Sequence, residues 1–434
     1  MPGSAGRGGL PLAPPVGMGD LVQPEATHRR ALGDRLVSTF GLYGYDLVAT
    51  PFFEHAEVLE RGLEQMDRRD LLRFVEPETG EVALLRPDIT PQIARIIATR
   101  LHDRPPPWRL CYEGHVIRRQ RGRARQQRQI AQAGVECVGL AGPEADVEVI
   151  ALAARACEAV GLHDYRVELG QVRIGRAALD DVPEAARASA ADALVHKDVA
   201  ALESLLREVN VPARERRRLT ALADLYGDLE VLPRARRLLR GSAAGRALDE
   251  LEDVAVRLAD RGLSAALVLD LGELRGQAYY TGVSFTLLAE GPGQPVGGGG
   301  RYDHLLGRFG PDAPATGFAL DLGNLTWALA RAGVPFAGSS RPRVVLATDA
   351  ADELAEALRA RGAVVAELGK RRRAEALAFA RAWGYDALLV RSGGGLRAHR
   401  VDDGAARTVD LAATDRLDAL LAWMRASDAN ANEG

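Results

Sequence analysis

Cysteine is scarce in this sequence: Cys111, Cys137 and Cys157 are the three cysteines among 434 residues. No two of them have the C-x-x-C spacing, so neither a zinc site nor a disulfide framework is indicated. The histidines form no spaced ligand set either. We therefore expect small buried thiols, a reducing compartment and no metal site.

Long hydrophobic runs are also missing, since no stretch reaches the roughly 18 apolar residues that a membrane span needs. Residues 1–20 lack the apolar core of a signal peptide and are expected to form a flexible lead-in. These absences predict a cytoplasmic protein with no membrane contact. The net charge is only -3, which argues against a protein that coats nucleic acid through bulk electrostatics, so any anion site must be local.

The hydrophobic periodicity predicts an α+β body followed by a smaller domain. Short strands and helices alternate over residues 21–335, with an antiparallel sheet expected and a helical insertion at about 175–263. "GYDLVATPFFE" is expected to be one strand that Pro51 stops, and Thr90 is expected to be the N-cap of a helix that starts at Pro91. After the Gly/Pro/Ser-rich seam "AGVPFAGSSRPR", residues 341–434 alternate strand and helix, which predicts a small α/β domain.

Six arginines crowd into "VIRRQRGRARQQRQIAQAGVE", residues 116–136, where Glu136 is the one acid. Guanidinium groups this close repel one another unless an anion or solvent surrounds them. The flanking apolar stretches predict two strands, so the arginines occupy a long hairpin loop. A nucleotide, a nucleic acid and plain solvent all remain possible partners of that loop.

Polar side chains near several predicted strands suggest a ligand site. Asp88, Gln132 and Glu136 offer carboxylates and an amide to an ammonium group, while Arg118 and Arg275 suit a carboxylate. Tyr279 and Tyr280 add phenols, and the glycines at 297–300 let the backbone approach a ligand closely. If these strands share a sheet, a zwitterionic amino acid would satisfy the site.

Residues 20–330 resemble the histidyl-tRNA synthetases and their paralogues. "GYDLVATPFFE" looks like the first class II motif, "QAGVE" like the strand that receives the substrate amine, and "LRGQAYYTG" like the histidine-specific signature. The resemblance implies a class II synthetase-like fold. It also implies a histidine-binding set, which comprises Asp88, Thr90, Arg118, Gln132, Glu136, Arg275, Tyr279 and Tyr280.

The departures from the synthetase pattern fall on the ATP side. Gln120 stands where the second motif has glutamate, and Ile130 stands where an aromatic side chain would stack on adenine. Gly323 and Asn324 replace the Glu-Arg pair of the third motif, and an asparagine cannot grip phosphate as a guanidinium does. Gln126 replaces a loop arginine, and Asp88 a glutamate. We therefore expect no catalytic residues, no cofactor and no enzyme activity of the chain itself.

"LLRPDITPQIARI" and "DALVHKDVAAL" resemble the regulatory subunits of ATP phosphoribosyltransferase more than any synthetase. That family implies a short catalytic subunit as partner, its activation, inhibition relayed from bound histidine, and a homodimer within a hetero-oligomer. The C-terminal domain resembles a trimmed anticodon-binding domain, but its acidic and basic residues nearly balance, so tRNA binding is not expected. A true histidyl-tRNA synthetase, or a paralogue with another protein or RNA target, is the alternative.

Overall fold

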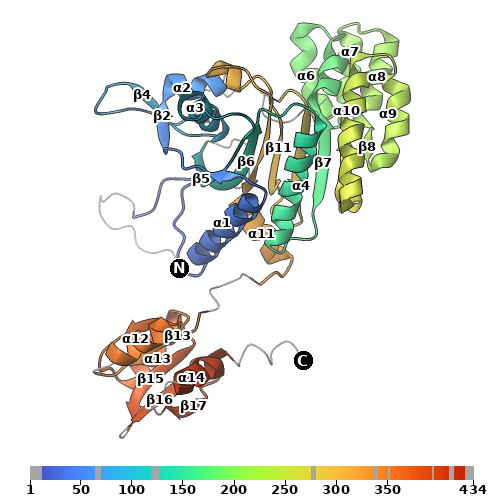
Figure 1. Ribbon diagram of the computed structural model, residues 1–434. Helices are drawn as coiled ribbons and strands as arrows, with labels where there is room; N and C mark the ends of the chain where they lie inside the picture. The colour runs from blue at the N-terminus through green and yellow to red at the C-terminus, as the bar shows by residue number, and fades with distance from the viewer. Residues whose placement is uncertain are drawn as a thin grey trace. The chain divides into compact units, whose positions relative to one another are not determined.

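The computed structural model describes residues 12–63, 70–118, 127–274, 280–335, 341–349, 352–392, 395–409 and 415–425. The chain divides into two compact units, Met1–Gly338 and Ser339–Gly434, each with its own sheet (Figure 1). Within these residues the architecture is α+β, as the sequence predicts.

A nine-stranded sheet forms the centre of the first unit. Its strand order is β1 (Asp46–Leu47), β5 (Trp108–Ile117), β6 (Gln129–Val138), β12 (Ala315–Asp321), β11 (Gly297–Arg301), β10 (Val283–Leu288), β7 (Arg166–Gln171), β9 (Leu267–Asp270) and β8 (Tyr226–Gly227). From β5 to β7 all neighbours are antiparallel, and parallel pairs occur towards the two edges, at β1–β5 and β7–β9.

The register gives the two faces of this sheet opposite characters. One row of partners across β6, β12, β11, β10 and β7 is Val135, Phe318, Gly299, Phe285 and Leu169. Helices α1 (Glu25–Leu42) and α4 (Pro143–Ala159) help to bury this apolar face, and the rings of Phe40 and Phe318 meet edge to face with centroids 5.6 Å apart. The adjacent row is Glu136, Gly317, Gly300, Ser284 and Gly170. Since neighbouring residues of a strand point to opposite faces, this polar and glycine-rich row belongs to the other face.

A second sheet of three strands, β2 (Phe53–His55), β4 (Val82–Leu85) and β3 (Arg73–Val75), packs against α2 (Ala56–Gly62), and α2 in turn contacts α3 (Thr90–Arg100). The strand expected in "GYDLVATPFFE" is β1, which ends before Pro51, but a second strand that was not expected, β2, follows Pro51 in a different sheet. Pro51 lacks an N–H group and restricts Thr50, which breaks the pairing there. Arg86 secures the break by donating to the carbonyl oxygens of Thr50, at 2.8 Å, and Pro51, at 3.2 Å. Thr90 is the first helical residue of α3 rather than its N-cap, which is Ile89.

Helices follow one another between β7 and β9, with the two-residue strand β8 among them. They are α5 (Val172–Leu179), α6 (Glu184–Val195), α7 (Val199–Glu208), α8 (Ala213–Ala223), α9 (Leu232–Leu239) and α10 (Ala243–Leu258), with short turns η2 (Leu229–Val231), η3 (Ala259–Leu263) and η4 (Ser264–Ala266). Figure 1 shows α6 to α9 as a group beside β7 and β8. Buried leucines such as Leu194, Leu206 and Leu222 join this group to the apolar core that also covers the large sheet. We refer to the helices between β7 and β9 as the helical insertion.

The last elements of the first unit are the turn η5 (Leu306–Arg308) and α11 (Leu322–Arg331). The second unit has a five-stranded sheet in the order β14 (Val364–Glu367), β13 (Arg343–Ala347), β15 (Ala387–Ser392), β16 (Gly395–Arg400) and β17 (Ala406–Val409). Helices α12 (Asp352–Ala360), α13 (Arg373–Ala382) and α14 (Asp415–Arg425) complete it. The α/β alternation confirms the prediction, although the short strand β17 was not expected.

Candidate functional site

A cavity of about 380 Å³ lies on the polar face of the large sheet. Its floor crosses β6, β12, β11, β10 and β7, and the loop before α3 and Tyr280 contribute walls. Glu136 on β6 and Glu168 on β7 stand four strands apart, and a spacing of about 4.8 Å per strand separates them by roughly 19 Å. This floor is wider than a single amino acid is long.

Glycine residues in the strands beneath the cavity leave room for the neighbouring side chains. A Cβ atom on Gly317 would lie 1.9 Å from Oε2 of Glu136, and one on Gly134 would lie 2.6 Å from the hydroxyl of Tyr112. Atoms of real side chains do not approach this closely, so glycine is required at both positions. Gly317, which lines the cavity, therefore leaves room for the carboxylate of Glu136.

Glu136 is the most buried acid of the cavity, with 1% of its surface exposed. Its Oε1 accepts a hydrogen bond of 2.6 Å from Oγ1 of Thr90, and the hydroxyl groups of Tyr302 and Tyr112 also bond to the carboxylate. Burial nevertheless raises the pKa of Glu136 to about 8. Without a cation this carboxyl group is mostly protonated at neutral pH, whereas an ammonium group in the cavity would favour its ionised form.

Three further polar groups surround that end of the cavity. Oδ1 of Asp88 accepts a hydrogen bond of 3.1 Å from the backbone N–H of Thr90 and is thereby held at the start of α3. Gln132 lies four residues before Glu136 on β6 and so shares its face. Burial raises the pKa of Tyr280, which keeps its phenol protonated and able to donate. Together these groups can hold an ammonium group and a polar ring.

Arg118, which directly follows β5, also lines the cavity, and Asp321 lies near it. Oδ1 of Asp321 caps α11 by accepting the N–H groups of Gly323, at 2.8 Å, and Asn324, at 3.0 Å. Burial raises the pKa of Asp321, and the charge of Arg118 opposes that shift. The amide of Asn324 donates to the carbonyl of Pro295 at 2.9 Å. The helix start that could receive a phosphate is thus already occupied by a carboxylate of the chain itself.

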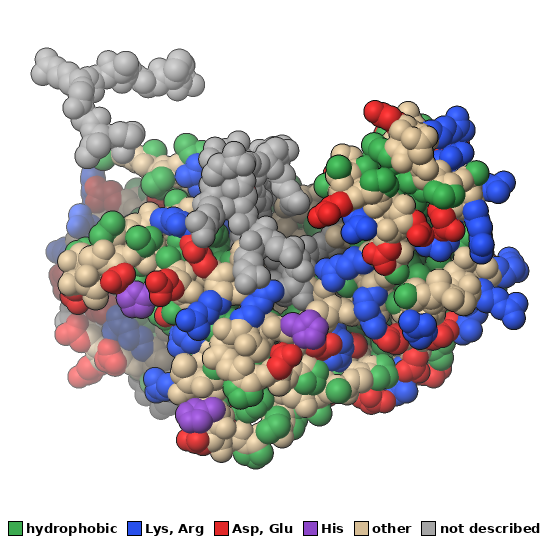
Figure 2. Space-filling view, turned by 90° about the horizontal axis from the view of Figure 1, so that it is seen from above, with side chains coloured by type: hydrophobic (Ala, Val, Ile, Leu, Met, Phe, Trp, Pro, Cys, Tyr) green, Lys and Arg blue, Asp and Glu red, His purple; other side chains and the backbone are tan. Residues whose placement is uncertain are grey.

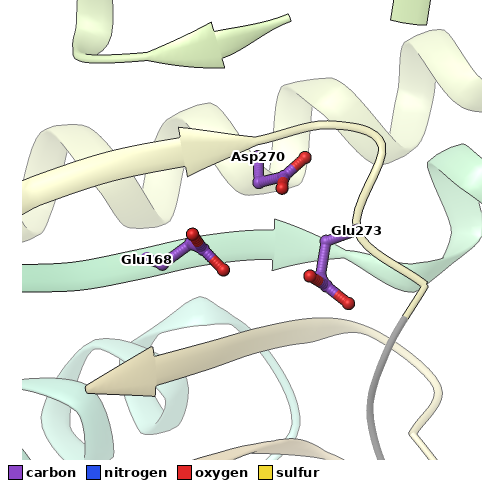
Figure 3. Close-up of side chains that lie close together, drawn as sticks. All are labelled: Glu168, Asp270 and Glu273. Carbon is purple, nitrogen blue, oxygen red and sulfur yellow. The ribbon is translucent and has the colours of Figure 1, made fainter. Parts of the chain in front are cut away.

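A group of three acids lies beside the end of β9. Figure 3 shows Glu168 on β7, Asp270 at the end of β9 and Glu273 after the turn, with carboxylate oxygens within 4.8 Å of one another. In the described part of the chain, this is the group with the spacing to hold a metal ion. Lys197 from the helical insertion already forms an ion pair with Asp270. Glu168 and Glu273 line the cavity.

Six of the eight residues expected to bind histidine line this one cavity: Asp88, Thr90, Arg118, Gln132, Glu136 and Tyr280. Arg275 and Tyr279 lie outside the described residues, as do Gln120 and Gln126 on the expected ATP side. Ile130 is 4% exposed and packs in an apolar cluster. The assignment of histidine to the cavity stays a prediction.

Sequence analysis missed several residues of the cavity. They are Tyr112, Tyr302, Asp321, Glu168 and Glu273. Tyr302 follows the glycine strand in "GGGGRYDHL", and Asp321 precedes a helix in "ALDLGNL", so both lay within stretches that were singled out. Glu168 and Glu273 left no local signal, because their proximity depends on the pairing of β7 with β9 across the helical insertion.

Two surface features bear on contact with membranes and nucleic acids. No helix in the described ranges is long and apolar enough to cross a membrane. Basic and acidic side chains lie interspersed on the face that Figure 2 shows, in keeping with the small net charge.

Comparisons with known proteins identify the family. The family model for histidyl-tRNA synthetase matches residues 17–325. The ATP phosphoribosyltransferase regulatory subunit of Moorella thermoacetica is 42% identical, over 87% of this chain and 97% of its own length. The corresponding subunit of Anaeromyxobacter sp. strain Fw109-5 is 46% identical, over 77% of this chain and 98% of its own length.

Solved structures agree with these relatives. A Bacillus halodurans protein described as an ATP phosphoribosyltransferase regulatory subunit/histidyl-tRNA synthetase has a TM-score of 0.77 and 29% identity, covering 88% of this chain and 99% of that one. Histidyl-tRNA synthetase from Nostoc sp. has a TM-score of 0.78 at 21% identity, covering 95% of this chain and 100% of that one, and shares the fold. The chain therefore belongs to the family of ATP phosphoribosyltransferase regulatory subunits of histidine biosynthesis, built on a histidyl-tRNA synthetase-like body.

Proposed function

We propose that this chain binds histidine in the cavity and passes its occupancy to a short catalytic subunit of ATP phosphoribosyltransferase. In this proposal the chain activates that subunit, confers histidine inhibition on it and catalyses no reaction itself. Its family membership supports the partner, since the relatives carry the name of a regulatory subunit. The polar groups that line the cavity support histidine as the ligand.

The distribution of charge around the cavity carries the histidine proposal. Asp88 and Glu136 lie at one end with Gln132 and Tyr280, while Arg118 offers a guanidinium group for a carboxylate. An amino acid with a polar ring can engage the acidic groups and the guanidinium group at once, and charge-assisted hydrogen bonds contribute about 1.5–3 kcal/mol each. Two or three such bonds give an affinity suited to sensing a metabolite.

The start of α11 supports a chain without catalysis. The synthetase resemblance places Asn324 where an arginine would grip the triphosphate, and here its amide is engaged with the carbonyl of Pro295. Asp321 adds a negative charge at the same place. Loss of one preorganised group of this kind costs roughly 10²–10³ in rate. Histidine-dependent exchange of pyrophosphate into ATP should therefore be undetectable.

The deciding experiment is a steady-state assay of phosphoribosyl-ATP formation by the cognate short catalytic subunit. It is run with and without this chain, and with and without histidine. We expect activity to rise with this chain and to fall again with histidine. Equal activity under all four conditions, together with separate elution of the two proteins on gel filtration, would overturn the proposal.

We also propose that the chain forms a homodimer through the segment that resembles the first class II motif. Large apolar side chains are exposed in this segment and just before it: Leu42 at 87%, Leu47 at 61%, Phe52 at 56%, Phe53 at 45% and Tyr43 at 40%. Such a concentration on one segment is unusual for a monomer surface. We propose a cytoplasmic location and no tRNA binding on the grounds given for the sequence.

A further inference from the structure

The stretch "DALVHKDVAAL" sets this chain apart from the synthetases, yet it lies outside the cavity. It forms the end of α6, a tight connection and the start of α7. Lys197 in the connection has φ +57°, a left-handed conformation that is uncommon for a residue other than glycine. The next residue, Asp198, caps α7 by accepting the N–H of Ala201 at 2.9 Å. The chain thus holds Lys197 in a strained, well-defined turn.

Lys197 reaches out of the helical insertion to the end of β9. Its Nζ donates to Oδ1 of Asp270, a residue that is 1% exposed. The same oxygen accepts the N–H of Gly272 at 3.0 Å. A Cβ atom on Gly272 would lie 3.1 Å from Nζ of Lys197 and 3.4 Å from the carbonyl oxygen of Leu222. The insertion therefore packs directly on the turn after β9.

That turn leads straight into the wall of the cavity. Glu273 lines the cavity, and a Cβ atom on Gly170 would lie 3.1 Å from Cβ of Glu273 and 3.4 Å from the carbonyl oxygen of Asp270. Glu168 and Glu273 bring their carboxylates within 4.8 Å of that of Asp270 (Figure 3). Such like charges repel one another unless a cation lies nearby. Lys197 brings a positive charge from the insertion to this group.

We propose that Lys197 is a positioning residue that couples the helical insertion to the ligand cavity. Acting through Asp270, it fixes the turn at 270–273 and so the place of Glu273 in the cavity wall. A ligand that orders this wall then also orders the insertion, and movement of the insertion changes ligand affinity. This coupling rests on the proposed binding of histidine in the cavity. The helical insertion is then the part of the chain that responds when histidine is bound.

The alternative is that Lys197 and Asp270 form a stabilising ion pair without any link to the ligand. Breaking such a pair leaves a buried charge uncompensated and lowers stability in either case. Ligand affinity measured well below the melting temperature distinguishes the two. A matched control is the pair of Arg218 and Asp181, with 3.3 Å between nitrogen and oxygen, which joins α8 to the residues just before α6. It also lies in the helical segment, but neither residue lines the cavity.

The test is calorimetric titration of histidine into the wild-type chain and its variants. We expect Lys197→Met to weaken binding by about 10-fold, within the usual range of coupling between sites. Lys197→Arg keeps the charge and should stay within about 3-fold of wild type, whereas Arg218→Met should lower the melting temperature and leave affinity unchanged. Asp270→Asn added to Lys197→Met should restore part of the affinity, because the uncompensated charge is removed.

Hydrogen exchange provides a second readout that needs no variant. Histidine should slow exchange in peptides covering residues 190–200 of the wild-type chain. Equal histidine affinity of wild type and Lys197→Met, or unchanged exchange in the insertion when histidine binds, would overturn the coupling alone. Absence of histidine binding to the wild-type chain would instead overturn the proposed function, and the coupling with it.

Discussion

Replacement of Glu136 by glutamine tests how the cavity recognises a cation. The carboxyl group has a pKa of about 8, chiefly because of burial, and so is roughly nine-tenths protonated at pH 7 in the free protein. Glutamine keeps the size of the side chain and removes the proton equilibrium. If an ammonium group binds beside Glu136, the wild-type carboxyl must release its proton, whereas the variant releases none.

The expected result follows from this linkage. At pH 7 histidine binding to the wild-type chain should release about 0.9 proton more than binding to Glu136→Gln, and the difference should shrink to about 0.5 at pH 8. Between pH 6 and pH 7 the wild-type affinity should rise nearly tenfold relative to that of the variant. Calorimetry in two buffers of different ionisation enthalpy gives the proton count directly.

The same group affects stability with a definite sign. In the unfolded chain a glutamate ionises near pH 4.3, but in the folded chain Glu136 stays protonated to about pH 8. Its contribution is fully present below about pH 4 and is lost as the pH rises towards 8, by at most about 1.4 kcal/mol per pH unit. The free energy of unfolding of the variant should lack this slope. Identical proton release and identical slopes in both proteins would refute a protonated Glu136.

Two further outcomes are expected. Gly317→Ala places a methyl group within 1.9 Å of Oε2 of Glu136. Histidine binding should therefore fall below detection by calorimetry, while circular dichroism should still show the fold. Binding within 3-fold of wild type would contradict the requirement for glycine at this position. Leu47→Glu puts a charge into the exposed segment of the proposed dimer face and should shift sedimentation from dimer to monomer. The control Val256→Glu changes a residue on α10 that is 45% exposed, and it should leave sedimentation unchanged. A wild-type chain that sediments as a monomer would exclude the interface.

The strands and the polar end of the cavity could be predicted from the sequence, because the geometry of a strand decides which residues share a face. Gln132 and Glu136 lie four residues apart on a strand, so they had to share a face once β6 was recognised. The stop at Pro51 was predicted, but the strand β2 after it was not, because a strand pattern does not tell which of two sheets a short apolar segment joins. The pair of Lys197 and Asp270 could not be predicted, since it depends on how the helical insertion returns the chain to β9. Asp321 as the cap of α11 was missed because the resemblance drew attention to Asn324.

The order of the strands has a consequence for biosynthesis. The cavity floor joins β6 to β12, pairing Gln132 with Asp321, and everything between them is synthesised before that pairing can form. Contacts between distant segments form slowly because a long loop must first close. Meanwhile β6 exposes a free edge, which is a hazard for aggregation. We therefore expect nascent chains that stop before β12 to depend on chaperones.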